Sequence, residues 1–336
     1  MVKPCFRRRA LVTSGKQEVN SWNIDRKFSC VHKDDALTKG LMMSQRYFEI
    51  LAPAQWVSPI VYNSPHSGSF SPEEFLHQSR LSENALRQSE DSFVDELFQS
   101  CLDQGAPLLR SKVSRSYIDL NREPYELDPR MFLEDLPGYM NSGSPRVASG
   151  LGTIPKIVAE GEEIYRGKIK LSDAMERINK IYRPYHRTLA ALLEEVYGAT
   201  QFSLLMDCHS MPSSAVRNLK SHHEPQIDIV LGDRYGSSCN RELSSEIEKM
   251  FAAEGFHVVR NRPYAGGFIT ETHGSPQHNR HALQIEINRA LYMDETRIEK
   301  NRGFAQVKAA IARVLKALSM FLPAIEEKAT RRLAAE

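Results

Sequence analysis

Two histidines follow short apolar runs that are typical of β-strands, and histidine is a common ligand of catalytic metal ions. His66 lies in the segment PHSG (65–68), after the β-branched run 57–62. His209 lies in the segment DCHS (207–210), after the apolar run 202–206. A catalytic zinc site takes about three ligands from His, Asp or Glu and keeps one position open for water. The pair therefore suggests a hydrolytic metal site, although a lone histidine at a strand end is more often a hydrogen-bonded structural residue.

Two carboxylates could serve such a site. Asp91 lies at the start of segment 90–104, whose apolar residues have helical spacing, and a carboxylate there also favours the helix dipole. Glu286 lies in the alternating run 283–288, and Gln284 and Asn288 share its face. A base that activates water beside a metal would occupy such a polar face. A strand with one solvated face would show the same pattern.

A third group of residues could bind an anion. Arg115, Asn121 and Arg122 lie in the segment SRSYIDLNR (114–122). Arginine binds carboxylates through two parallel hydrogen bonds, and a neighbouring asparagine can share the contact. A salt-bridged surface segment would have the same composition, so the pattern indicates a carboxylate site without requiring one.

The elements that must position these residues alternate between strands and helices, without an internal repeat. This alternation is typical of one α/β domain with a mixed or mostly parallel sheet, whose sites lie at the carboxyl ends of strands. For the long helix expected at 172–197, we predict Ser172 as the N-cap, a kink at Pro184 and an end just before Gly198. The pattern predicts strands at 57–62, within 107–121, and at 202–206, 227–231, 257–260 and 283–288, helices at 90–104, 172–197, 237–254 and 295–321, and a long loop at 137–156.

Composition places the chain among ordinary globular proteins. Its 336 residues are 41% hydrophobic and 26% charged, and no apolar stretch approaches the length of a membrane-spanning helix. Residues 1–41 carry nine Lys and Arg against four Asp and Glu, whereas the other 295 residues carry 35 against 38. The main body therefore gives no reason to expect nucleic acid or a membrane as partner. Five dispersed cysteines are typical of reduced thiols in a cytoplasmic protein.

Residues 1–42 are expected to form a poorly ordered basic leader. They contain Arg7, Arg8 and Arg9 but no apolar core of a secretory signal. Met42 and Met43 precede the first orderly segment, and either could be the true start of the protein.

Three common enzyme motifs are excluded. The segment GEEIYRGK (161–168) matches GxxxxGK, but Ile169 stands where a P-loop has Ser or Thr, and two acids occupy the phosphate position. HExxH and GxSxG do not occur, which argues against zincin proteases and α/β-hydrolases.

The segments above, in their order and spacing, resemble the N-formylglutamate amidohydrolase family from about residue 56 to 295. The resemblance implies a single catalytic domain at 43–336, with a three-layer α/β sandwich around a mixed, mostly parallel sheet like that of zinc carboxypeptidases. The motifs that carry it are PHSG (65–68), EDSFVD (90–95), SRSYIDLNR (114–122), YRPYH (182–186), DCHS (207–210) and LQIEINR (283–289).

The resemblance also implies roles for individual residues. His66 and His209 match the two histidines that hold zinc, Arg115 matches the arginine that polarises the scissile carbonyl, and Glu286 matches the base. Asn121 and Arg122 match the clamp for the substrate α-carboxylate. In the wider carboxypeptidase group a glutamate three residues after the first histidine completes the zinc site, but Ser69 stands there in this chain.

The third metal ligand must therefore come from elsewhere, and we expect Asp91 rather than Glu90. His273, in the segment ETHG (271–274), is expected to be a pocket residue or an alternative metal ligand. His186, beside Pro184 in the predicted long helix, is expected to be packed and hydrogen-bonded. Fe²⁺, Co²⁺ or Mn²⁺ could occupy a site of this kind in place of Zn²⁺.

The function implied is hydrolysis of N-formyl-L-glutamate to formate and L-glutamate, a step of histidine degradation. Two alternatives stay open: a zinc amidase for another N-acyl amino acid or small peptide, and a metal-free ligand-binding protein of the same fold. The oligomeric state is open as well. A cation for the substrate γ-carboxylate could come from Arg260, Arg262, Arg280 or Lys220.

Overall fold

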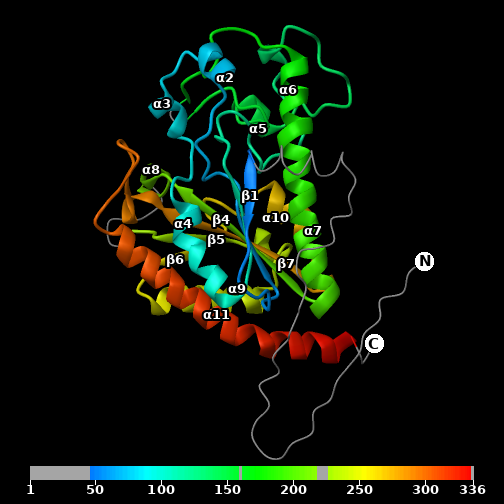
Figure 1. The fold of residues 1–336 in the computed structure, drawn as a ribbon, viewed down its shortest axis with the longest axis vertical. Helices are drawn as coiled ribbons and strands as arrows, with labels where there is room; N and C mark the ends of the chain where they lie inside the picture. The colour runs from blue at the N-terminus through cyan, green and yellow to red at the C-terminus, as the bar shows by residue number, and fades with distance from the viewer. Residues whose placement is uncertain (1–45, 159–160, 218–225, 334–336) are drawn as a thin grey trace, which may run out of the picture.

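The computed structural model describes residues 46–158, 161–217 and 226–333 (Figure 1). The predicted leader 1–42, with its alternative start at Met42 or Met43, lies outside the described residues, as does Lys220. Within the described part, no helix is long and apolar enough to cross a membrane.

A seven-stranded mixed sheet with the order β1-β3-β2-β4-β7-β5-β6 forms the centre of the fold. Four neighbouring pairs are parallel, and only β1–β3 and β5–β7 are antiparallel. The predicted mixed, mostly parallel sheet is confirmed. The strands are β1 Phe48–Leu51, β2 Ile60–Ser64, β3 Leu108–Ser111, β4 Ser203–Met211, β5 Ile229–Gly232, β6 Val258–Arg260 and β7 Arg280–Asn288, and a separate two-stranded ladder joins β8 Met293–Asp294 to β9 Glu299–Lys300.

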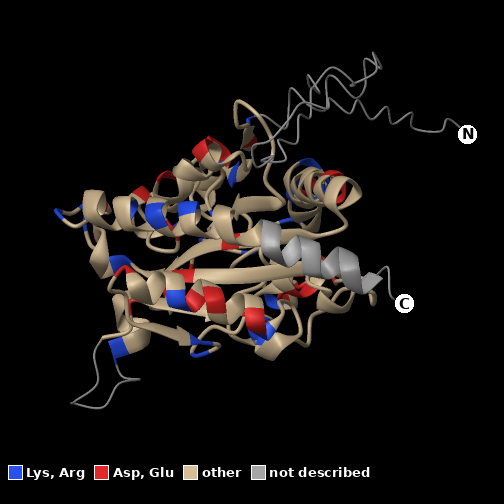
Figure 2. Ribbon diagram, turned by 90° about the horizontal axis from the view of Figure 1, so that it is seen from below, with Lys and Arg blue, Asp and Glu red and all other residues tan. Residues whose placement is uncertain are grey.

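Helices cover both faces of the sheet (Figures 1 and 2). One apolar core holds α4, α9 and α11 against the sheet, and a second core holds α6, α7 and α10 against the opposite face. Figure 2 shows the acidic and basic residues interspersed along the helices. The helices are α2 Glu73–Gln78, α3 Glu83–Arg87, α4 Val94–Phe98, α5 Pro145–Ala148, α6 Leu171–Arg177, α7 Arg183–Thr200, α8 Ser213–Arg217, α9 Arg241–Ala253, α10 Phe268–His273 and α11 Phe304–Leu333.

The two central strands, β4 and β7, differ between their faces. On one face both strands present apolar side chains along their length to the first core, among them Met206 and Ile285. On the other face both begin apolar, with Leu205 and Ala282, and then become polar toward their carboxyl ends. Every residue of β4 and nearly every residue of β7 is buried, so this polar end is not the solvated strand face that the sequence also allowed.

Several predicted boundaries are wrong at the start of a helix. Asp91 precedes α4, which begins at Val94 after a left-handed Phe93, and a 3-10 helix (Gln99–Gln104) continues it. The last helix begins at Phe304, because the residues before it form β8, β9 and their turns rather than the first turns of a helix.

The long predicted helix is divided into three parts. Ser172 is not its N-cap, because helix α6 already begins at Leu171, and Gly198 lies inside α7, which ends at a left-handed Gln201. A π-helical turn (Ile178–Tyr182) precedes Pro184. Tyr182 and Arg183 keep helical dihedrals, so α7 continues from the π-helical turn without a break, and Pro184 lies in its first turn, where proline is tolerated.

Smaller differences affect the remaining elements. Strand β4 extends past the predicted 202–206 to Met211, so His209 lies within the strand. The segment 107–121 holds one strand followed by an irregular loop. The loop 137–156 contains the short helix α5. Short 3-10 helices also occur at Pro129–Met131, Arg234–Gly236, Pro276–His278 and Arg289–Leu291.

Candidate metal centre

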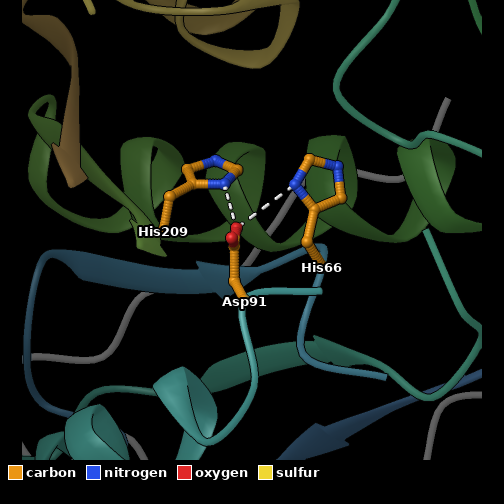
Figure 3. A group of neighbouring side chains, drawn as sticks. All are labelled: His66, Asp91 and His209. Carbon is orange, nitrogen blue, oxygen red and sulfur yellow. Dashed lines mark hydrogen bonds and ion pairs between the residues drawn. The ribbon is translucent and has the colours of Figure 1, made fainter. Parts of the chain in front are cut away.

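Three predicted ligands lie together at the carboxyl ends of β2 and β4 (Figure 3). His66 follows β2, His209 lies in β4, and Asp91 lies in the turn before α4. Nδ1 of His209 is 2.9 Å from Asp91 Oδ2, and Nδ1 of His66 is 3.4 Å from the same oxygen. One ligand atom from each residue falls within 4.8 Å of the other two, and all three residues are buried.

Backbone contacts fix this arrangement. Strands β2 and β4 are parallel neighbours, with Asn63 beside Asp207, so their carboxyl ends reach the same edge of the sheet. The Asp91 N–H donates to the His66 carbonyl at 3.0 Å, which joins the two ligand segments directly. Gly68 allows the loop after His66 to pass against the end of β3, because a Cβ there would lie 2.1 Å from the carbonyl carbon of Lys112.

The outer nitrogen of each histidine faces a second carboxylate. His66 Nε2 lies 2.7 Å from Asp119 Oδ1, and His209 Nε2 lies 3.0 Å from Asp207 Oδ2. Metal-binding histidines usually donate this second N–H to a carboxylate, which fixes the tautomer and leaves the other nitrogen free for the metal. Both Nδ1 atoms are therefore turned toward the space next to Asp91.

Asp91 is held by its other oxygen. Arg289 Nη2 donates to Asp91 Oδ1 at 3.0 Å, and Ser210 Oγ donates to the same atom at 3.2 Å. Burial raises the pKa of the Asp91 carboxyl, but its contacts with His209 and His66 outweigh burial and hold that pKa well below its usual range. Asp91 is therefore a carboxylate with Oδ2 directed at both histidines.

The donors fit a bound divalent metal ion. His66 Nδ1 is buried and has no hydrogen-bond partner in the described structure, which is costly for a polar atom that nothing else satisfies. Burial lowers the pKa of His209, but Asp207, Asp91 and Glu286 raise it well above its usual range, so three carboxylates act on this imidazole. Two imidazole nitrogens and one carboxylate oxygen are the ligand set of many catalytic zinc sites.

Glu286 lies beside this group on the next strand. The register of β4 and β7 places it directly opposite His209. Its side chain accepts a hydrogen bond from Gln284 Nε2 at 2.8 Å. Burial raises the pKa of the Glu286 carboxyl to about 7, against the opposing influence of His209. A carboxyl group with this pKa can take up and release a proton near neutral pH.

Asp119 also organises the predicted anion-binding residues. Arg115 donates from Nε to Asp119 Oδ2 at 3.0 Å, and among the described residues no hydrogen bond uses its terminal nitrogens. Arg122 gives Nε to the Leu151 carbonyl at 2.8 Å and Nη1 to the Asn121 carbonyl at 2.9 Å, while Nη2 lies 3.7 Å from Asp119. Both arginines thus keep donors that a substrate could use.

Asn121 also makes contacts within the protein, in addition to its predicted role in binding a substrate carboxylate. Its Oδ1 accepts the Ile269 N–H at 2.8 Å, and its Nδ2 lies 3.2 Å from His209 Nε2. Because the Nε2–H of His209 is directed at Asp207, that nitrogen does not accept from Asn121, and the hydrogens of Nδ2 are left for a substrate.

Other predicted residues lie outside the ligand group. Glu90 faces Arg87 Nε at 3.0 Å rather than the histidines. Burial lowers the pKa of His273 to about 4, and its Nε2 is buried without a partner in the described structure, but it is not part of the cluster. His186 is packed, as expected, with its ring stacked on Tyr182 and Nε2 at 2.9 Å from the Leu120 carbonyl.

Two of the cations suggested for a γ-carboxylate are already paired. Arg280 binds Glu194 at the start of β7, at the opposite end of the strand from Glu286. Arg260 binds Glu248 at 3.0 Å. Arg262 is exposed on the segment after β6.

Sequence reasoning assigned no individual role to four residues that support the site: Asp119, Asp207, Gln284 and Arg289. A periodic signal was available for two of them. Asp207 precedes His209 by two positions and Gln284 precedes Glu286 by two, and such pairs share one face of a strand. The long-range contact of Arg289 with Asp91 left no local signal.

The α/β fold and the cluster of His66, Asp91 and His209 correspond to a class of hydrolases that activate water at the edge of the sheet. A model of the N-formylglutamate amidohydrolase family matches residues 58–293, and the chain belongs to that family. The family predicted from the motifs is thereby confirmed, and the protein is an enzyme, a hydrolase of linear amide bonds.

Individual relatives agree with this assignment. The chain is 29% identical over 251 residues to the N-formylglutamate deformylase of Pseudomonas aeruginosa, covering 74% of this chain and 86% of that protein. The crystal structure of N-formylglutamate amidohydrolase from Ralstonia eutropha superimposes with a TM-score of 0.77 at 33% identity, covering 82% of this chain and 98% of that one. A structure from Agrobacterium tumefaciens shares the fold, with a TM-score of 0.58 at 16% identity.

Proposed function

We propose that this protein is a zinc-dependent deformylase that hydrolyses N-formyl-L-glutamate to formate and L-glutamate. The observation that carries the proposal is the convergence of His66 Nδ1, His209 Nδ1 and Asp91 Oδ2, with Glu286 on the adjacent strand. The names of the relatives supply the substrate. We also propose residues 43–336 as the catalytic domain.

His66, Asp91 and His209 would hold the metal. Zinc bound there supplies a Lewis acid that lowers the pKa of a water molecule and polarises the formyl carbonyl. Glu286 accepts the proton of the attacking water and passes it to the nitrogen as the C–N bond breaks, so that formate and the free amine leave.

The arginines bind the substrate. The free terminal nitrogens of Arg115 donate to the formyl oxygen, where negative charge develops in the transition state. Arg122 Nη2 and Asn121 Nδ2 bind the α-carboxylate. Asp119 keeps both arginines in place from behind, since it contacts Arg115 at 3.0 Å and Arg122 at 3.7 Å.

We place the reaction in the cytoplasm, as the last step of a route of histidine degradation. The described cysteines Cys101, Cys208 and Cys239 are free and buried, which agrees with a reducing compartment. Fe²⁺, Co²⁺ or Mn²⁺ could replace zinc in the same ligand set.

Formate release from N-formyl-L-glutamate tests the proposal. We expect activity in protein purified with zinc, its loss after chelation, and its return when zinc is added back. Equal kcat/KM for N-formyl-L-leucine would contradict a dedicated glutamate substrate and favour a broader N-acyl amidase. A folded protein that neither binds zinc nor releases formate would support the metal-free binding protein instead.

A further inference from the structure

A loop that was not among the predicted catalytic residues contacts both the strand that carries Glu286 and the segment that carries Asn121. The glycine loop (Tyr264–Gly267) follows β6 and leads into α10. The Gly267 N–H donates to Gln284 Oε1 at 2.8 Å. Two residues further on, the Ile269 N–H donates to Asn121 Oδ1 at 2.8 Å. Two side-chain amides from different strands and loops therefore hold the same short stretch of backbone.

Gln284 connects this loop to the base. Its Oε1 accepts from Gly267, and its Nε2 donates to Glu286 Oε1 at 2.8 Å. Gln284 and Glu286 share one face of β7, and their exposed fractions are only 4% and 7%. Because the amide is anchored at its oxygen, its nitrogen has a fixed direction, and Glu286 Oε1 accepts from a fixed donor.

The glycine loop has little freedom to move away from Gln284. A Cβ at Gly267 would lie 2.5 Å from Asn121 Nδ2, and a Cβ at Gly232 would lie 2.7 Å from the carbonyl carbon of Ala265. Gly266 has a φ of +125°, a conformation that strongly favours glycine. The loop therefore packs against both Asn121 and β5 at distances that only glycine permits.

We infer that Gln284 is a positioning residue for catalysis: it holds Glu286 Oε1 so that Oε2 is presented to the reacting water, and the glycine loop holds Gln284. This inference rests on the proposed function, in which Glu286 is the base. The inference needs no contact between Gln284 and substrate, because the oxygen and one amide hydrogen of Gln284 already bind Gly267 and Glu286. Misplacing a catalytic group by about 1 Å can cost on the order of 100-fold in rate.

Two substitutions at Gln284 separate its two hydrogen bonds. Gln284→Met keeps the length of the side chain and removes both hydrogen bonds. Gln284→Glu keeps an oxygen that accepts from the Gly267 N–H, but puts a second carboxylate oxygen where Nε2 donates to Glu286. For both variants we expect kcat to fall about 10- to 100-fold while KM stays within about threefold and zinc content is unchanged. Gln104→Met is the matched control, because its amide also accepts one hydrogen bond, from Ser319 Oγ at 3.1 Å, but lies at the end of the 3-10 helix Gln99–Gln104.

A double variant tests whether Gln284 acts through Glu286. If it does, Gln284→Met combined with Glu286→Gln is no slower than Glu286→Gln alone, within about twofold, because groups that act as a unit are not additive. Multiplicative losses would overturn the inference, since they would mean that Gln284 contributes independently. A loss confined to KM would overturn it too.

Backbone exchange tests the anchoring without any turnover. We expect the Gly267 amide to exchange with D₂O at least about tenfold faster in Gln284→Met than in wild type, and at the wild-type rate in Gln284→Glu. Gly267→Ala should lower kcat and also raise KM, because its Cβ would lie 2.5 Å from Asn121 Nδ2, whereas Gly138→Ala, with no atom within 4 Å of the added Cβ, should change neither. Unchanged exchange in Gln284→Met rejects the inference, while a metal-loaded wild type that is inactive on N-formyl-L-glutamate rejects the proposed function.

Discussion

The two faces of the central strands β4 and β7 are equally buried but are stabilised in different ways. One face packs apolar side chains such as Met206, Cys208 and Ile285 against α4, α9 and α11. The other face, at the carboxyl ends of the same strands, carries Asp207, His209 and Glu286. The first depends on how closely its side chains fill space, and the second depends on a partner for each polar atom.

Histidine shows the difference most directly, because each face has one on the central strands. His281 lies on the apolar face of β7, with its ring 5.1 Å from that of Phe202, and burial alone lowers its pKa to about 4. On the polar face, surrounding carboxylates raise the pKa of His209 well above its usual range. The same side chain, buried to a similar degree, is kept neutral in one setting and favours a cation in the other.

The largest expected effect comes from the polar face and concerns activity. Glu286→Gln should lower kcat about 10³-fold or more, because general base catalysis contributes roughly 10²- to 10⁴-fold and the amide cannot accept the proton. Zinc content should be unchanged. Formate release with saturating zinc measures the effect, and Glu299→Gln on the exposed ladder β8–β9 is the control. Turnover near the wild-type rate would refute the role of Glu286.

The same variant should not be less stable at alkaline pH. In the metal-free protein burial raises the pKa of Glu286 to about 7 from its ordinary value of 4.5. Between these pH values the folded state keeps a proton that the unfolded state has released, so Glu286 lowers stability as pH rises through this window. Glutamine has no charge to bury, so chelated Glu286→Gln should unfold at a urea concentration no lower than chelated wild type at pH 8.

On the apolar face a substitution should lower the stability of the protein and leave its catalytic rate nearly unchanged. Ile285→Ala removes a fully buried side chain beside Leu283 and Ile287 in the first core. We expect a loss of about 2–5 kcal/mol in the free energy of unfolding, with kcat per folded molecule within about threefold of wild type. Urea unfolding and turnover below the transition measure the two quantities. A large fall in kcat would show that the two faces are coupled.

The sequence predicted the residues of the candidate centre better than the elements that carry them. His66, Asp91 and His209 could be selected because metal chemistry limits the residue types and because strand ends are visible as apolar runs. The end of β4 was misjudged, since Asp207 and His209 look like a polar loop although tertiary contacts pair them with β7. The N-terminus of α4 was misjudged because Phe93 adopts a left-handed conformation that no local preference indicates.

Supporting contacts between distant segments could not be predicted at all. Arg289 and Asp91 are separated by most of the domain, and Gln284 meets Gly267 only because β7 and the glycine loop pack together. At Ser172 and Gly198 the local signals were present but misleading. Both residue types favour helix ends, yet the helix begins before Ser172 and continues past Gly198. Local patterns thus specified the candidate ligands and the periodicity of the elements, while packing determined the element boundaries and the contacts that support the site.

A smaller effect should come from the carboxylate behind the first histidine. Asp119→Asn keeps the shape of the side chain but weakens the acceptor for His66 Nε2–H, so the affinity for zinc should fall about 10- to 100-fold. Competition with a chromophoric chelator measures this in both proteins, and the exposed Asp103→Asn is the control. Unchanged affinity would mean that Asp119 serves only the arginines Arg115 and Arg122.

The smallest expected effect concerns His281, the neutral histidine of the apolar face, and the pH dependence of stability. Folded His281 has a pKa of about 4 and unfolded histidine about 6.5, so protons bind the unfolded chain first as pH falls through this window. His281 should therefore cost up to about 2 kcal/mol of stability between pH 7 and pH 5, with no contribution above pH 7. His281→Asn, which can still accept from the Asn240 N–H, should show a shallower loss of urea stability over that range than wild type. Parallel pH profiles for the two proteins would show that the imidazole is protonated in the folded state, and the contrast with His209 would then fail.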